Sequence, residues 1–162
     1  MRRRSTGDRN TDDRSADDAG SAIIEFVFVA VIVMVPLIYL IGAVATVQRT
    51  QLAVSQAARD AGRAFATSNT SVEASARVRA AVRLAFADQG LPDDATVRFV
   101  ASGSGCTAAP ITPRLAAGAE FTVCVTRRAD LPAVPSILAG RGIRTTGAYV
   151  VHVDDFRQVA GQ

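Results

Sequence analysis

The chain has 162 residues, which favours one modest folded domain, and its formal net charge of +3 comes from 18 basic and 15 acidic residues. That charge is small and scattered, and aromatic residues do not alternate with the arginines, which argues against a nucleic-acid-binding protein. One histidine, two cysteines and no CxxC or Cys/His spacing argue against a metal site, and no cofactor is indicated.

The first part of the chain, residues 1–20, is polar and mixes Arg with Asp. Five Arg and five Asp side chains cancel each other within it. Residues 1–19 show no hydrophobic periodicity, so we predict that they are disordered. We interpret residues 1–20 as a cytoplasmic leader peptide.

A long apolar stretch follows the leader. Residues 26–47 contain no charged side chain, and as a helix they would be about 33 Å long, compared with about 30 Å for the hydrocarbon core of a bilayer. We therefore predict a transmembrane helix over residues 21–47, with a bend at Pro36. Five Arg precede it, and three follow it closely, at Arg49, Arg59 and Arg63. This bias favours a single-pass membrane protein with a cytoplasmic N-terminus and its C-terminal domain outside.

The helical pattern continues beyond the apolar stretch. Residues 48–67 carry an apolar stripe at helical spacing, and small residues four apart would let another helix approach closely. The stripe consists of Val54, Ala57, Ala58, Ala61 and Phe65. We predict an amphipathic stalk that continues the membrane helix. The alternative is the first helix of the folded domain, and the two interpretations overlap.

Residues 68–162 are predicted to form an extracytoplasmic α+β domain in which a second helix packs on a small antiparallel sheet. Thr70 and Glu73 fit a capping box at the start of that helix, and Gly90 followed by Pro92 indicates its end. The predicted buried face of the helix consists of Val78, Ala81, Val82, Ala85 and Phe86.

Three further segments alternate as strands do, at residues 96–102, 119–128 and about 148–153. The stretch "GSGC" is interpreted as a turn, and residues 131–142 as a loop. The apolar faces of the first two strands are predicted to consist of Val97, Phe99, Ala101, Phe121, Val123 and Val125.

The two cysteines, Cys106 and Cys124, both follow the apolar stretch. Strand alternation points Cys124 to the side of the sheet opposite to Val123. In an exported domain we expect the pair to form one disulfide, and two buried free thiols are the alternative.

Glu25 is an unusual residue at the start of a membrane helix, because a carboxylate in the apolar region costs roughly 2 to 3 kcal/mol. If the chain is cut between Gly20 and Ser21, the new α-amino group lies one helical turn from the Glu25 carboxylate. The two groups could then pair within one chain or between neighbouring chains, which would relieve the cost of burying both. Such a pair would set the register of helices that otherwise slide along apolar faces.

The stretch "GSAIIEF", residues 20–26, resembles the processing site of type IV pilins, where prepilin peptidase cuts after the Gly. The single membrane helix, the extension rich in Ala and Arg, and the cysteine-bearing strands are similar to TadE-like proteins of the tight adherence (Tad/Flp) pilus system. The resemblance covers about residues 18–157 and is strongest over residues 20–65.

This resemblance implies that Gly20 and Ser21 are the scissile pair and that Glu25, followed by Phe26, is needed for assembly. It implies a minor pseudopilin, not an enzyme, whose partners are prepilin peptidase, other pilin or pseudopilin subunits and the Tad membrane machinery. Phe26 departs from the family pattern, in which Tyr is frequent at this position.

The main alternative is an unprocessed, membrane-anchored module that binds an envelope partner through its exterior domain. A secreted protein cut after Ala45 is another, but the apolar stretch before that site is about 20 residues, longer than a signal peptide needs. The three interpretations predict different mature N-termini: Ser21 for the pseudopilin, Met1 for the unprocessed module and Thr46 for the secreted protein.

An enzyme is not indicated. His152 lies in an alternating strand beside Asp154 and Asp155. No Ser/His/Asp spacing accompanies it, so a structural or exposed histidine is the expected role.

Overall fold

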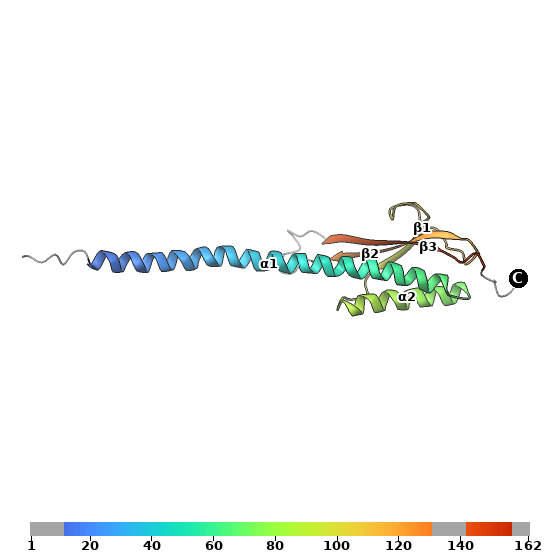
Figure 1. Cartoon of the computed structure of the whole chain (residues 1–162), viewed down its shortest axis with the longest axis horizontal. Coiled ribbons are helices and arrows are strands. Elements are labelled where there is room, and N and C mark those ends of the chain that lie inside the picture. The colour runs from blue at the N-terminus through green and yellow to red at the C-terminus, as the bar shows by residue number, and fades with distance from the viewer. Residues whose placement is uncertain (1–11, 131–141, 157–162) are drawn as a thin grey trace, which may run out of the picture. The chain divides into compact units, whose positions relative to one another are not determined.

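The computed structural model describes residues 12–130 and 142–156, and of residues 12–22 the backbone alone. This part of the chain is an α+β protein with two helices and three strands (Figure 1). The helices are α1 (Asp12–Ala66) and α2 (Ser71–Asp88), and the strands are β1 (Thr96–Ala101), β2 (Glu120–Ala129) and β3 (Ile143–His152). The predicted class is therefore confirmed, with a long apolar N-terminal helix and a small antiparallel sheet. The chain divides into two compact units, with the boundary between Ile41 and Gly42, inside α1.

The first unit consists of the N-terminal part of α1. Between residues 23 and 41 every side chain is exposed except Ala30, which is half-buried. The helix continues through Pro36, although a proline removes one backbone hydrogen bond.

The predicted disorder of residues 1–19 is wrong for residues 12–19, because α1 already begins at Asp12. Once a helix has been nucleated, each further residue adds a hydrogen bond at little extra cost. Residues 12–19 contain no Gly or Pro that would stop this extension. Hydrophobic periodicity reports burial, so its absence in a polar segment does not exclude a helix.

The second unit contains the sheet, whose strands are antiparallel in the order β1-β2-β3. The register pairs Phe99 with Val123 and Val123 with Tyr149, so these three side chains share the inner face, which the core covers. Arg98 and Cys124 form the neighbouring row and point to the opposite, outer face.

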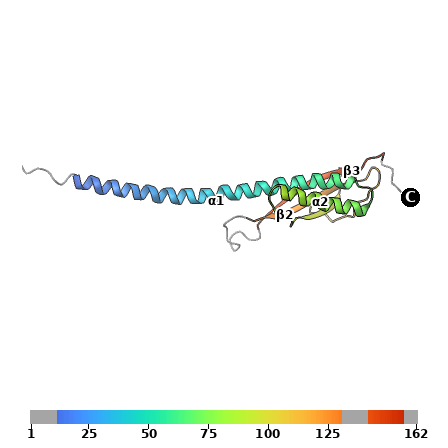
Figure 2. The same ribbon diagram turned by 90° about the horizontal axis from the view of Figure 1, so that it is seen from below.

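One hydrophobic core joins the C-terminal part of α1, α2 and the inner face of the sheet. The stripe predicted along residues 48–67 is confirmed as buried: Val54, Ala57, Ala58 and Ala61 are fully buried, and Phe65 is 4% exposed. The rings of Phe65, Phe99 and Phe121 lie with their centroids 5.0 to 5.8 Å apart, which suits tilted and edge-to-face aromatic contacts. In the views of Figures 1 and 2, α2 lies beside the C-terminal half of α1.

Two glycines allow α1 to lie directly on β3. A Cβ atom at Gly147 would overlap the backbone carbonyl of Val54, and one at Gly62 would lie 2.6 Å from Tyr149 Cδ1 and 2.7 Å from Val151 Cγ2. Val54 on α1 lies against Gly147 on β3, and Gly62, further along α1, lies against Val151, further along β3. The helix and the strand therefore run in the same direction.

The ends of α2 follow the sequence signals. The Thr70 hydroxyl accepts a hydrogen bond from the Glu73 N–H at 3.1 Å, and the Glu73 carboxylate accepts one from the Asn69 N–H at 2.9 Å. The capping box is thus confirmed, although Glu73 reaches the residue before the N-cap. Gly90 has φ +64°, and the residue after it donates to the Phe86 carbonyl at 2.9 Å, which closes the helix in a Schellman motif.

Some details differ from the sequence predictions. Strand β3 begins at Ile143, about five residues earlier than expected, because Gly147 and the threonines before it interrupt the apolar alternation without ending the strand. Ala101, predicted on the apolar face, is exposed at the end of β1, and Ala81 is only half-buried. The predicted loop lies outside the described residues except for its last residue.

Candidate functional site

The proposed processing segment lies near the start of α1. The bond between Gly20 and Ser21 is inside the helix, so positions 21 and 25 are four residues apart on one helical face. Glu25 is exposed, and the Phe26 side chain is 73% exposed. Within the described residues no ion pair involves Glu25.

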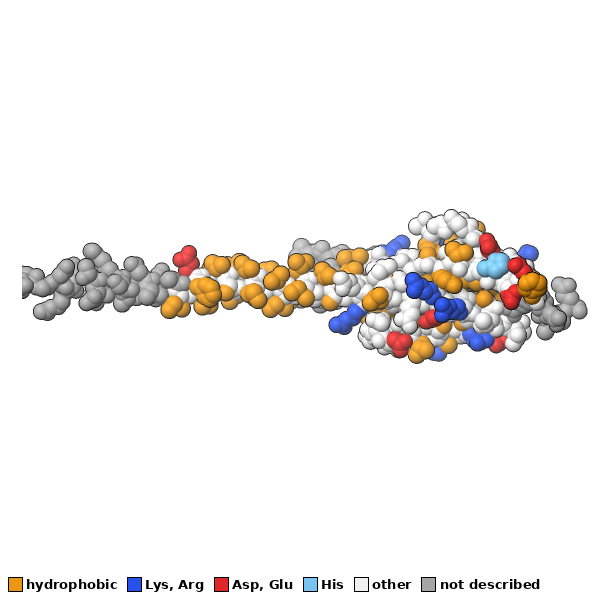
Figure 3. Space-filling view, viewed as in Figure 1, with side chains coloured by type: hydrophobic (Ala, Val, Ile, Leu, Met, Phe, Trp, Pro, Cys, Tyr) orange, Lys and Arg blue, Asp and Glu red, His pale blue; other side chains and the backbone are white. Residues whose placement is uncertain are grey.

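The surface of this helix is apolar along much of its length. By length and composition, Ile23–Ala66 could cross a membrane, and it is the one such helix in the described ranges 12–130 and 142–156. Its most apolar window has a mean hydropathy of 2.8 and none of it is buried. Hydrophobic side chains line the visible face in Figure 3. An exposed apolar surface of this extent is typical of a segment that contacts lipid or protein.

Two threonines mark the change from apolar to polar surface. The Thr46 hydroxyl donates to the Gly42 carbonyl, and the Thr50 hydroxyl donates to the Thr46 carbonyl, both at 2.9 Å. These hydroxyl groups are satisfied inside α1, so they can lie next to an apolar environment at little cost.

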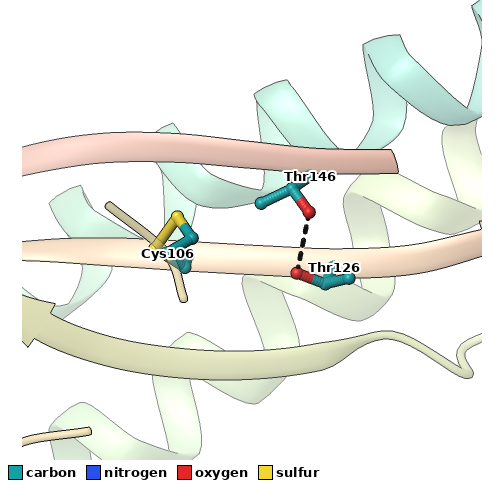
Figure 4. The surroundings of a disulfide bond; sticks show 4 residues. Cys106, Thr126 and Thr146 are labelled. Carbon is teal, nitrogen blue, oxygen red and sulfur yellow. Dashed lines mark hydrogen bonds between the residues drawn. A yellow bond between two sulfur atoms is a disulfide. The ribbon is translucent and has the colours of Figure 1, made fainter. Parts of the chain in front are cut away.

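The cysteines are brought together on the outer face of the sheet. Cys106 and Cys124 form a disulfide with their Cα atoms 5.7 Å apart, the pairing expected from the sequence. The bond ties the connection between β1 and β2 to the centre of β2. Near it, Thr126 and Thr146 share a hydrogen bond of 3.1 Å, with the helices behind the sheet (Figure 4).

Next to the disulfide is an open groove of about 550 Å³ on the outer face. Arg128 and Arg144 are directly paired across β2 and β3, and Arg98 lies further along on β1. Like charges directly opposite one another in a sheet repel each other. The groove is lined by Asp94, Thr96, Arg98, Cys106, Thr107, Thr126, Arg127, Arg128, Arg144 and Thr146. It thus combines four guanidinium groups and several hydroxyl groups with a single carboxylate.

Arg127 differs from the other arginines of the groove because it points to the inner face and is only 5% exposed. Its guanidinium binds the Asp94 carboxylate through two hydrogen bonds, of 2.5 and 3.4 Å, and lies 6.0 Å from the centroid of the Phe86 ring. A buried arginine needs such a partner. The Asp94 carboxylate that lines the groove is therefore already paired with Arg127.

A second charged cluster lies where β3 ends. His152 Nδ1 is 3.2 Å from the Glu120 carboxylate, and Nε2 is 3.4 Å from that of Asp155. The hydrogen bond with Glu120, and then the one with Asp155, raise the pKa of His152 above its ordinary 6.5. In Figure 3 acidic side chains flank the pale-blue histidine. All three side chains are more than half exposed, and this arrangement is an ion-pair cluster without a nucleophile.

Comparison of the chain with family models, with curated proteins and with solved structures finds no match.

The structure joins the two predicted cysteines, and it places Gly20, Ser21, Glu25 and Phe26 in α1, in the other unit. The arginine groove was not anticipated. Alternation within one strand predicts which face of the sheet an arginine of that strand points to. It does not predict which residues of the neighbouring strands lie beside that arginine, because this depends on the register between the strands.

Proposed function

We propose that this chain is a minor pseudopilin of a Tad/Flp-type pilus. In this proposal α1 crosses the cell membrane once, with the leader in the cytoplasm and the disulfide-bonded domain outside. Prepilin peptidase cuts between Gly20 and Ser21, and the trimmed chain aids assembly of a pilus used in adhesion or secretion. The single observation that carries the proposal is the position of Gly20 and Glu25 just before the uncharged apolar stretch of α1, the one described helix that could cross a membrane.

Trimming would give Glu25 a partner. The amine released at Ser21 is positive and lies about one helical turn from the Glu25 carboxylate. In an apolar environment the two charges stabilise each other, whereas either one alone is costly. Pairing between neighbouring chains would fix the register of their apolar helices during assembly.

The second unit supports an exterior location. A disulfide persists in oxidising compartments and is rare in the cytosol. The C-terminal part of α1 itself contributes to the hydrophobic core of this unit.

The cleavage is tested with Gly20→Ala, using Gly42→Ala as the matched control in the same helix. In the native cell we expect Gly20→Ala to remain at its full length in the membrane, and Gly42→Ala to be trimmed normally. Intact mass distinguishes the two forms. Normal trimming of Gly20→Ala would remove the assignment of the cleavage site to Gly20, whereas an untrimmed wild-type chain would favour the membrane-anchored binding module.

A further inference from the structure

An exposed aromatic side chain follows strand β3. The Phe156 side chain is 92% exposed, more than any other large hydrophobic side chain of the described residues. Its backbone N–H donates to the Asp154 carboxylate at 2.9 Å, which holds the segment in a turn. The Asp155 carboxylate lies 3.4 Å from His152 Nε2, whereas Asp154 has no ion pair within the described part of the chain. We call Asp154, Asp155 and Phe156 the acidic knob.

An apolar cavity of about 320 Å³ lies between α2, β1 and the connection that follows β1. That connection is held against the strand, because the Ile111 N–H donates to the Phe99 carbonyl at 2.8 Å. An apolar cavity of roughly 150 Å³ is large enough to bind benzene, so this one can hold a phenyl ring. We call it the apolar socket. Its lining includes Phe65, Val78, Val97, Phe99 and Pro113, with Arg79 among them.

Arg79 gives the apolar socket a positive charge. Its side chain is exposed, and no ion pair involves it among residues 12–130 and 142–156. Arg83 and Asp93 lie with it around a neighbouring hollow. A carboxylate that accompanies an aromatic ring into the socket would therefore meet the Arg79 guanidinium, and charge-assisted hydrogen bonds of this kind are strong.

The acidic knob and the apolar socket belong to opposite edges of the sheet. Strand β2 lies between β1 and β3, the knob follows β3, and the socket lies beside β1. The knob of one copy can thus meet the socket of a copy placed next to it. Because such a contact joins two different surfaces, it can repeat from copy to copy.

We propose that the acidic knob of one copy inserts into the apolar socket of a second copy of this chain. The Phe156 ring enters the cavity, and the Asp154 carboxylate lies next to Arg79. Burial of the exposed ring and pairing of the two charges both favour the contact. The chain itself carries a segment with the ring and the charge that the socket fits, which favours a second copy over an unrelated partner. The inference goes beyond the proposed function and requires neither a membrane span nor processing at Gly20.

The test uses photochemical cross-linking of the full-length chain in liposomes. A photoreactive benzoylphenylalanine replaces Phe156, and this chain is mixed with an equal amount of isotope-labelled wild-type chain. After irradiation and digestion, mass spectrometry identifies the linked peptides, and the label shows whether two copies are joined. We expect links between copies that reach the peptides containing Val78 or Phe99.

The controls change the labelled copy or the position of the probe. Arg79→Glu in the labelled copy should lower the yield of the link roughly tenfold, because like charges facing each other across an interface are strongly unfavourable. Arg59→Glu makes the same charge reversal on an exposed residue of α1 outside the socket and should leave the yield unchanged. A probe at Val150, which is 53% exposed on β3, should give no link to the socket. Circular dichroism verifies folding of each variant.

Links confined to single chains would mean that the socket is filled by the chain's own segment, and they would overturn the proposal. An absence of links between copies, links that miss the socket, or equal yields for Arg79→Glu and Arg59→Glu would overturn it as well. Trimming is measured separately by intact mass. An untrimmed chain that forms the link would therefore support the contact while refuting the processing.

Discussion

Gly147 fits against α1 because it has no side chain. A methyl group at this position would overlap the Val54 carbonyl, and backbone atoms cannot move aside as a flexible side chain does. We expect Gly147→Ala to lower the free energy of unfolding of the second unit by about 3 kcal/mol. Gly105→Ala is the matched control, because its new methyl would be 4.0 Å from the nearest atom. Urea unfolding of the full chain in detergent measures both, and equal midpoints would contradict the close contact.

His152 should make stability depend on pH. Its pKa is raised above 6.5 by Glu120 and then Asp155, so the folded state holds the proton more tightly than the unfolded state. This stabilisation is complete below about pH 6.5 and is lost as the pH rises through the raised pKa. His152 is the one histidine of the sequence, so no other histidine obscures the effect.

We expect the imidazole resonances of His152 to titrate above pH 6.5 by NMR. The melting temperature should fall as the pH rises through that titration, and His152→Gln should remove this fall. A midpoint at or below 6.5 would mean that the two carboxylates do not hold the proton.

Glu25 has a predicted role in assembly and none in insertion. Glu25→Gln removes the charge that would pair with the amine of Ser21, and it also lowers the cost of entering the membrane. We expect this variant to be inserted and trimmed but to be absent from assembled pili. Phe26→Tyr is the control, because Tyr is frequent at this position in the TadE-like proteins that the chain resembles. We expect this variant to assemble. Normal recovery of Glu25→Gln in the pilus fraction would rule out the ion pair.

At the scale of elements, the disulfide stabilises the connection between β1 and β2. It closes a loop with a sequence separation of 18. Chain entropy then gives a stabilisation of about 3 kcal/mol. We expect Cys106→Ser/Cys124→Ser to lower the free energy of unfolding by that amount, and reductant to shift the wild-type urea midpoint to the variant's value. A fully reduced wild type with an unchanged midpoint would contradict this role.

Several elements could be predicted because local signals specify them. The stripe from Val54 to Phe65 has helical spacing and is buried, and Thr70 with Glu73 begins α2 as the capping box requires. Alternation in β2 placed Cys124 opposite to Val123, and the register agrees. In these cases neighbours within a few residues determine the conformation.

Other features depend on contacts between distant segments. The start of β3 follows from pairing with β2, because residues such as Thr145 and Gly147 carry no apolar alternation of their own. Arg128 and Arg144 are 16 positions apart in the chain, and only the strand register makes them neighbours. The sequence did not predict a helix over residues 12–19, because these residues extend the apolar helix that follows them and show no burial pattern of their own.

At the scale of the whole molecule, the two units differ in their relation to water. The first exposes apolar side chains on almost every residue between 23 and 41, whereas the second buries its apolar residues in one core. A helix of the first kind is stable in lipid or in a bundle of similar helices. A pseudopilin would use both environments, first as a membrane protein and then in an assembly.

The most direct test of the proposed function is the mature N-terminus. The protein is extracted from the membrane of its native cell, and its intact mass and N-terminal sequence are determined. A chain that begins at Ser21 is the predicted result, and it would provide the amine that Glu25 requires. A chain that begins near Met1 would contradict the processing and would identify the protein as an anchored exterior module, and one that begins at Thr46 would indicate a secreted protein.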